Sequence, residues 1–302
     1  MLDTVKSWFL NDDEPIAADD PNGDKINLSR IIPYIAIHLG VFAIFLVGFS
    51  WTAALLCFTL YFFRMFFITG FFHRYFSHKA FKANRAVQFI MGFLGTTAVQ
   101  RGPIWWAAHH RHHHGNSDQP SDPHSPHQHS FIWAHGLWFL SNRNFQTQKQ
   151  YVKDLLRFPE LVWLDRLDIL PPIMLAISTY LFGITANSFF PELGTNGWQC
   201  FVWGFVVSTV FLYHGVYTIN SLSHLFGSRR FETTDHSRNN FILAIITLGE
   251  GWHNNHHHYQ ASARQGFKWY EIDITYYMLK IGSWVGLFKS LRPVPPNIRN
   301  HP

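Results

Sequence analysis

The sequence predicts an all-α integral membrane protein, with four transmembrane helices in two hairpins and a cytoplasmic helical cap. Charged residues make up only 14% of the 302 residues, whereas a soluble domain usually contains about 25%. Four windows hold the roughly 20 mainly apolar residues that cross a bilayer as one helix. All 24 Lys and Arg residues lie in residues 1–30, in 64–166 or after 228, which separates charged segments from apolar ones.

The four predicted spans follow one another in two pairs. Residues 31–50 and 51–72 are separated only by a tight turn, and residues 169–189 and 198–219 by a short loop. Because Lys and Arg gather on the cytoplasmic side of membrane proteins, the three charged segments and both termini are expected there. The turn and the short loop are then expected on the opposite side.

The amino-terminal segment differs in charge from the rest of the chain. Residues 1–25 contain seven acidic and two basic side chains. We therefore expect residues 1–28 to form a solvated acidic tail that need not be ordered, and residues 29–302 to form a single membrane domain. The remainder is basic, but its charges are scattered and form no basic helix, so no nucleic-acid partner is expected.

Histidine carries the chemical signal of this sequence, at 20 of 302 positions. Three clusters and one smaller element fall on the predicted cytoplasmic side. They are FFHRYFSHKAF (71–81), AAHHRHHHGN (107–116), GEGWHNNHHHYQ (249–260) and TINSLSHLFG (218–227).

The spacing within each cluster indicates which histidines can share a helix face. Residues at i, i+3 and i+4 share one face, as in the set His253, His256 and His257. In residues 107–116 two registers satisfy this rule, and the residues alone leave both open. His73 and His78 are i, i+5, about 140° apart on an α-helix, so that pair either straddles a bend or holds two metals from different sides.

Together the clusters supply more imidazoles than one metal ion can bind. Neutral imidazole suits iron, copper, nickel and zinc. No cysteine lies in the clusters, which argues against a structural zinc site. Carboxylates are sparse there as well, unlike the glutamate-rich di-iron site of ferritin-like bundles. Two redox metals held by histidine is the interpretation that uses the most residues.

The remaining histidines are expected to have other roles. His38 and His214 lie within predicted spans, where a hydrogen-bonded interior histidine is the simpler interpretation. A loose group in one loop is expected to be solvated or to support the ligands from outside; it comprises His124, His127, His129 and His135.

The motifs HRYFSH, HRHHH and HNNHH resemble the three histidine motifs of membrane fatty-acyl desaturases. NSLSHLFG, DPHSP and GEGWHNNHHHY are also similar to that family, and the closest resemblance is to bacterial acyl-CoA (stearoyl-CoA Δ9 type) desaturases, over about residues 30–295. The family motif HRxHH selects His110, His113 and His114 and leaves out His109 and His112. The metal ligands that the resemblance implies are His73, His78, His110, His113, His114, His224, His253, His256 and His257, with Asn220 acting through a water.

The resemblance also implies how the ligands divide between two irons. One iron would take His73, His78, His110, His114 and His257. The other would take His113, His224, His253 and His256, together with the water on Asn220.

The activity implied by the resemblance is O₂-dependent desaturation at a di-iron centre (Fe²⁺/Fe³⁺). The expected reaction introduces a cis double bond, at Δ9, into a long-chain saturated acyl thioester, with acyl-CoA favoured. The sequence has no haem-binding HPGG segment and no flavin fingerprint. A ferredoxin, or a cytochrome with its reductase, would therefore supply the electrons from outside. We also expect a multi-pass protein of the bacterial inner membrane, with its active site on the cytoplasmic side.

Substrate contacts are also carried over from the resemblance. Gln100, Trp106 and Tyr217 would line an apolar slot for the acyl chain, and Arg143 would contact the head group. Ala108 stands where animal acyl-CoA enzymes have a basic residue, which weakens the case for CoA and leaves an acyl-lipid or acyl-carrier-protein substrate open. Arg64 is a charge within the second predicted span, where it either has a function or snorkels to the interface.

Three other functions compete with this interpretation. A hydroxylase of the same histidine-rich superfamily, acting on alkyl or acyl chains, would share the iron chemistry. A metal-transport membrane protein would place its ligands near the bilayer midplane, whereas these clusters lie past the ends of the predicted spans. An intramembrane zinc protease would need HExxH, which the sequence lacks.

Overall fold

A computed structural model describes residue 20 and residues 22–300, and in these residues the fold is helical apart from one small sheet. The sheet pairs β1 (Lys82–Ala83) antiparallel with β2 (Phe288–Lys289). The α-helices are α2 (Leu28–Gly40), α3 (Ile44–Val47), α4 (Trp51–Phe66), α5 (Arg85–Thr96), α6 (Pro103–Asn116), α7 (Asn142–Phe145), α8 (Pro159–Arg166), α9 (Leu170–Phe189), α10 (Gly197–Cys200), α11 (Ser208–Asn220), α12 (Phe241–Ile246), α13 (His253–His258), α14 (Ile274–Trp284) and α15 (Pro296–Arg299). The π-helical segments are η2 (Phe67–Ser77), η3 (Trp133–Leu137) and η7 (Phe201–Val207), and the 3-10 segments are η1 (Val41–Ala43), η4 (Trp138–Leu140), η5 (Lys149–Tyr151), η6 (Pro191–Leu193) and η8 (Leu222–His224).

Within the described residues, four helices are long and apolar enough to cross a membrane, as predicted. They comprise Arg30–Val47, Trp51–Ser77, Leu170–Phe189 and Gly197–His224. Large apolar side chains on them face outward, and Leu46, for example, is 88% exposed, as expected of a surface covered by lipid. The hairpin arrangement, the cap and the cytoplasmic orientation stay predictions.

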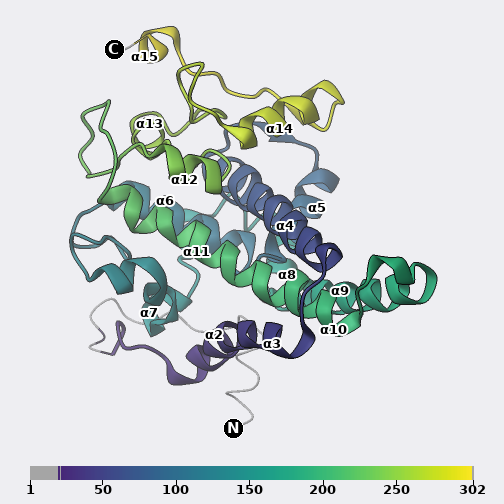
Figure 1. Cartoon of the computed structure of the whole chain (residues 1–302). Helices are drawn as coiled ribbons and strands as arrows, with labels where there is room; N and C mark the ends of the chain where they lie inside the picture. The colour runs from purple at the N-terminus through teal and green to yellow at the C-terminus, as the bar shows by residue number, and fades with distance from the viewer. Residues whose placement is uncertain (1–19, 21, 301–302) are drawn as a thin grey trace.

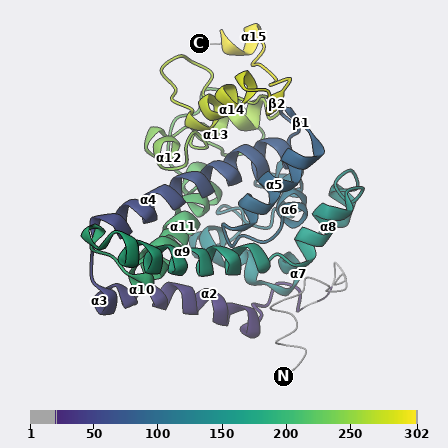
Figure 2. The same cartoon turned by 90° about the vertical axis from the view of Figure 1, so that its right-hand side faces the viewer.

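The first and the last of the described helices lie at opposite ends of the molecule. In Figures 1 and 2, α2 and α3 lie at the end of the amino terminus, and α12 to α15 lie at the end of the carboxy terminus. Helix α6 lies between them and packs against η2 and α8. The histidine-rich α6 is therefore enclosed by other elements.

The predicted turn between the first two spans is present. A glycine conformation, a helix cap and a hydrogen bond to another helix stabilise it. Gly48 adopts a φ of 70°, which is costly for other residues. Ser50 then caps α4, because its hydroxyl accepts a hydrogen bond from Ala53 N at 3.1 Å. Gln199 Nε2 donates to Val47 O at 3.0 Å, so the turn is also tied to the fourth long helix.

Arg64 does not snorkel to the interface, because its side chain is buried between helices. The residue is only 2% exposed. Its guanidinium donates to Thr97 O at 3.2 Å and to Thr209 Oγ1 at 2.8 Å. Arg64 therefore joins α4 to α11 and to the residues after α5.

The second long helix changes from α-helical to π-helical where it reaches the histidine clusters. At the end of η2 the backbone hydrogen bond spans five residues, because His78 N donates to His73 O at 3.2 Å. The Ser77 side chain also donates to Phe72 O, at 2.7 Å. A π-turn is wider than an α-turn. It therefore brings residues at i, i+5 to the same side of the helix.

The amino-terminal part of the chain is attached where the structure describes it. The predicted acidic tail falls mainly on residues 1–19, which lie outside the described residues. Asn27 N donates to Leu140 O at 3.0 Å, and Arg143 N donates to Gly23 O at 2.8 Å. The Arg143 side chain forms an ion pair with Asp24 at 3.0 Å. The division of the chain at residue 28 stays a prediction.

Asp165 fixes the start of α6 through two hydrogen bonds. Its Oδ1 accepts hydrogen bonds from Ile104 N at 3.0 Å and from Trp105 N at 2.9 Å. Gly102 permits this approach, because a Cβ there would lie 2.3 Å from Oδ1. Burial raises the pKa of Asp165 from 3.8 to about 7. The folded state therefore binds this proton more tightly than the unfolded state, and the stability contributed by Asp165 falls as pH rises from about 4 to about 7.

Asp165→Asn should keep both hydrogen bonds and remove that pH dependence. Asp165→Ala should leave the two amide groups unpaired and cost about 1–3 kcal/mol. Thermal unfolding of the detergent-solubilised chain, monitored by size-exclusion chromatography at pH 5 and at pH 7, measures both effects. The same pH dependence in Asp165→Asn as in the parent chain would contradict the assignment.

Candidate metal centre

The structure brings the nine predicted histidine ligands together in two neighbouring groups. In each group one ring nitrogen per residue lies within 4.8 Å of all the others. The first histidine group contains His73, His78, His110, His114 and His256. The second histidine group contains His113, His224, His253 and His257. The side chains come from η2 and its end, α6, η8 and α13, which are far apart in sequence.

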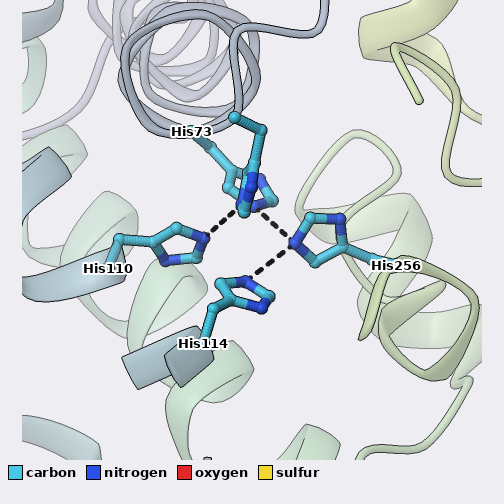
Figure 3. A group of neighbouring side chains, drawn as sticks. His73, His110, His114 and His256 are labelled. Carbon is cyan, nitrogen blue, oxygen red and sulfur yellow. Dashed lines mark hydrogen bonds between the residues drawn. The ribbon is translucent and has the colours of Figure 1, made fainter. Parts of the chain in front are cut away.

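The rings of the first histidine group point toward a common centre, as Figure 3 shows for His73, His110, His114 and His256. His256 Nε2 lies 2.9 Å from His73 Nε2 and 3.0 Å from His114 Nε2. His78 Nε2 lies 2.8 Å from His110 Nε2. The π-helical η2 explains why His73 and His78 can share this centre, with ring centroids 4.9 Å apart.

The second histidine group is more deeply buried than the first, since all four of its members are buried. His224 Nε2 lies 3.1 Å from His253 Nε2. The ring centroids of His253 and His257 are 4.3 Å apart, and those of His113 and His257 are 5.3 Å apart. His257 Nε2 is buried and has no hydrogen-bond partner, which leaves it available to a metal.

The expected division of ligands between the two centres is wrong for His256 and His257. His256 belongs to the first histidine group and His257 to the second, the reverse of the expectation. Helix geometry explains the difference, because residues at i, i+4 share one face more closely than residues at i, i+3. On α13, His257 therefore lies beside His253, whereas the centroids of His253 and His256 are 6.1 Å apart.

Burial keeps most of these imidazoles neutral, which is the form that binds a metal. It holds the pKa values of five of them well below the usual range; they are His78, His110, His114, His253 and His256. Burial also lowers the pKa of His257 to about 4, against the effect of Asp235. His113 differs, because neighbouring carboxylates outweigh its burial and raise its pKa. The two groups fit metal ions that accept several neutral nitrogen ligands.

Four carboxylates that the sequence analysis missed hold rings of the two histidine groups from behind. Asp118 Oδ2 accepts from His224 Nδ1 and Asp122 Oδ2 from His113 Nδ1, each at 2.9 Å. Asp235 pairs with His257 Nδ1, and Glu250 pairs with His73 Nδ1. Such partners fix the orientation of a metal-binding histidine and raise its basicity. Two of these carboxylates could have been predicted, because Asp118 and Asp122 follow the HRHHH motif closely in the sequence.

Histidines outside the two groups have other partners in the described structure. His109 Nε2 lies 2.9 Å from Gln146 O, and the ring of His112 stacks on Tyr151 with centroids 5.1 Å apart. His124 is buried and stacks on His113 at 4.3 Å. His38 Nδ1 contacts Tyr34 O at 2.6 Å.

The rest of the predicted loop group and His214 lie farther out. His127 and His129 are exposed, although His127 Nε2 contacts His224 O at 3.0 Å. His135 is partly buried and pairs with the exposed His214, with Nε2 and Nδ1 3.0 Å apart.

A small cavity of about 40 Å³ lies between the two histidine groups and apolar side chains. Trp106 and Asn220 line it, together with members of both groups. Trp106 also stacks on His110, with ring centroids 4.9 Å apart. Gln100 and Tyr217 are buried but do not line this cavity, and Arg143 lies with the amino-terminal residues.

A family model named "Fatty acid desaturase" matches residues 49–280, which include every member of both histidine groups. The chain belongs to the fatty acid desaturase family. Membership makes it an oxidoreductase of lipid metabolism, and this desaturase family uses a di-iron centre. The two histidine groups are the residues that could hold the metals.

Individual relatives of this desaturase differ in the acyl carrier and bond position that they are named for. The chain is 36% identical over 84% of its length, and 86% of the relative, to an sn-2 palmitoyl-lipid 9-desaturase of Nostoc sp. (strain 36). It is 32% identical over 96% of its length, and 90% of the relative, to an acyl-CoA 5-desaturase of Anemone leveillei. A further relative is an sn-1 stearoyl-lipid 9-desaturase of Synechocystis sp., at 35% identity over 91% of the chain and 84% of the relative.

Proposed function

We propose that this desaturase introduces a cis double bond at Δ9 of a long saturated acyl chain, with two irons, O₂ and electrons from an external donor. The observation that carries the proposal is the pair of converging imidazole groups beside a partly apolar cavity. Support for Δ9 comes from two of the relatives, which are named for position 9. The nine histidines would be the ligands, and Asn220 would hold a water at the second histidine group.

The roles of the surrounding residues follow from their contacts. Bound iron would supply the oxidising power, through O₂, that no side chain offers for an unactivated alkyl chain. The four carboxylates hold the imidazoles in fixed tautomers and orientations. Trp106, Met65 and Ile68 present apolar surface to the cavity. They would position an acyl chain there and exclude water from it.

Desaturation needs electrons, and residues 1–302 contain no recognisable haem or flavin motif. We propose a ferredoxin, or a cytochrome with its reductase, acting on the cytoplasmic side of a bacterial inner membrane. A second cavity, of about 360 Å³, borders His78 and His114 of the first histidine group. That cavity is open and gives this group contact with solvent.

For the acyl carrier, we propose a membrane glycerolipid in place of the acyl-CoA favoured by the sequence. Ala108 is buried and uncharged, where animal acyl-CoA enzymes have a basic residue. Arg143 is paired with Asp24 and is therefore already neutralised. Of the three relatives described above, two are named as acyl-lipid desaturases and one as an acyl-CoA desaturase.

Expression in a host that lacks Δ9 desaturation tests the reaction. We expect gas chromatography–mass spectrometry of derivatised fatty acids to show a new cis-Δ9 monoene, which His113→Ala abolishes. A hydroxylated chain without an olefin would instead indicate a hydroxylase. Unchanged unsaturation with altered metal uptake would indicate a transport protein.

The carrier requires a separate measurement on the purified chain in nanodiscs. The chain receives an electron donor and either distearoyl phosphatidylcholine or stearoyl-CoA as the only saturated substrate. We expect the monoene from the phospholipid. Product from stearoyl-CoA alone would contradict the glycerolipid proposal and restore acyl-CoA.

A further inference from the structure

The carboxylates behind the ligand histidines are unevenly distributed between the two groups. In the second histidine group, three of four members pair with an aspartate: His224 with Asp118, His113 with Asp122 and His257 with Asp235. In the first histidine group, among residues 22–300, only His73 has such a partner, which is Glu250. The smaller group of imidazoles therefore has the larger number of carboxylates.

The neighbouring cations increase the difference in carboxylate charge between the two groups, because the carboxylate of the first group is paired with an arginine. Arg74 is 1% exposed and forms an ion pair with Glu250 at 2.9 Å. The same guanidinium pairs with Asp273 at 2.9 Å. In the described part of the chain, the ion pairs of Asp118, Asp122 and Asp235 are all with histidines and none with Lys or Arg. Three carboxylates therefore face the second group without an ion pair to Lys or Arg among the described residues, and the Arg229 guanidinium reaches Asp235 only at its backbone O, at 2.8 Å.

Backbone amides hold these three aspartates in place behind the second histidine group. Asp118 Oδ2 also accepts from His236 N at 2.8 Å, and Asp122 Oδ2 from Asp118 N at 2.9 Å. Asp235 Oδ1 accepts from Ser237 N at 3.0 Å. The surrounding loops are built to keep the charges in place.

We propose that the second histidine group binds its metal ion more tightly than the first, so that a chain loaded with one equivalent of Fe²⁺ holds it there. A carboxylate behind an imidazole raises the basicity of that ligand. Uncompensated negative charge in a buried site also attracts a dication more strongly than in water. The higher count of imidazoles in the first group would favour the opposite order. The inference rests on the proposed two-iron function.

Stepwise loading of the full-length, metal-free chain in detergent, without O₂, tests the order. One equivalent of ⁵⁷Fe²⁺ should give one Mössbauer doublet, and a second equivalent should add a different doublet. Asp122→Asn and Asp235→Asn should alter the doublet that appears first and weaken that site by about 10–100-fold. Glu250→Gln should alter only the doublet that appears second. Iron per chain after dialysis against a chelator reports the affinities independently.

Asn and Gln keep the shape of the carboxylate, and two aspartate variants in different loops guard against a failure of one to fold. Glu160→Gln is the matched control, because Glu160 forms an exposed ion pair with Arg85 and should change neither doublet. Two Fe per chain that fill together, or a first doublet altered by Glu250→Gln, would overturn this inference alone. Saturation below two Fe per chain would overturn the proposed two-iron function as well.

Discussion

Replacing His114 with alanine should reduce desaturation by more than about 100-fold, whereas replacing His109 or His112 should change it only a few-fold. His114 Nε2 lies 3.0 Å from His256 Nε2 within the first histidine group. Loss of residues that only support a ligand already costs about 10–100-fold, so loss of a ligand should cost more. His109 and His112 lie on the other side of α6, against Gln146 and Tyr151.

The measurement is the yield of monounsaturated fatty acid per mole of purified variant, with iron per chain from the same preparation. His114→Ala should lose both, and His112→Ala should keep both. His109 is buried, so His109→Ala is first checked for thermal stability. Equal losses of activity and iron in His109→Ala and His114→Ala would mean that the other register of the motif binds the metal.

Helix spacing predicted part of this site and could have predicted more. On α6, the pair at i, i+4, His110 and His114, falls in one group, while His113 falls in the other. The same rule places His253 with His257 on α13. The residues could therefore have given the division of His256 and His257, which the family pattern assigned the other way.

Other features could not be read from periodicity, because they depend on distant parts of the chain. The π-turn of η2 brings His73 and His78 together, and an α-helical wheel sets them about 140° apart. The carboxylates come from loops up to 177 residues away from their histidines, as for Glu250 and His73. The small number of acidic residues within the motifs therefore concealed these four contacts. The four long helices were predictable because length and composition alone specify them.

The arginine of HRHHH is expected to do more than mark the register, because Arg111 joins α6 to the end of η2, and these two elements carry four of the five members of the first histidine group. Its guanidinium donates to Ser77 O at 2.9 Å and to Phe76 O at 2.6 Å, at the end of η2. It also donates to Tyr151 O at 2.8 Å and pairs with Asp154 at 2.7 Å. The carbonyls at a helix end need such donors, so Arg111 holds His78 in place opposite His110 and His114.

Arg111→Ala should therefore lower the free energy of unfolding by about 2–4 kcal/mol, since it leaves three carbonyls and a carboxylate without their donor. Arg111→Lys keeps the charge but not the planar donor geometry, and it should fold yet hold less iron in the first histidine group. Thermal unfolding and iron per chain measure the two effects. Lys79→Gln is the control, because Lys79 pairs with the same Asp154 but is 58% exposed, and such pairs contribute only about 0.2–1 kcal/mol. Wild-type iron content in Arg111→Lys would contradict this role. It would show that a positive charge is enough to hold His78 in place without the guanidinium.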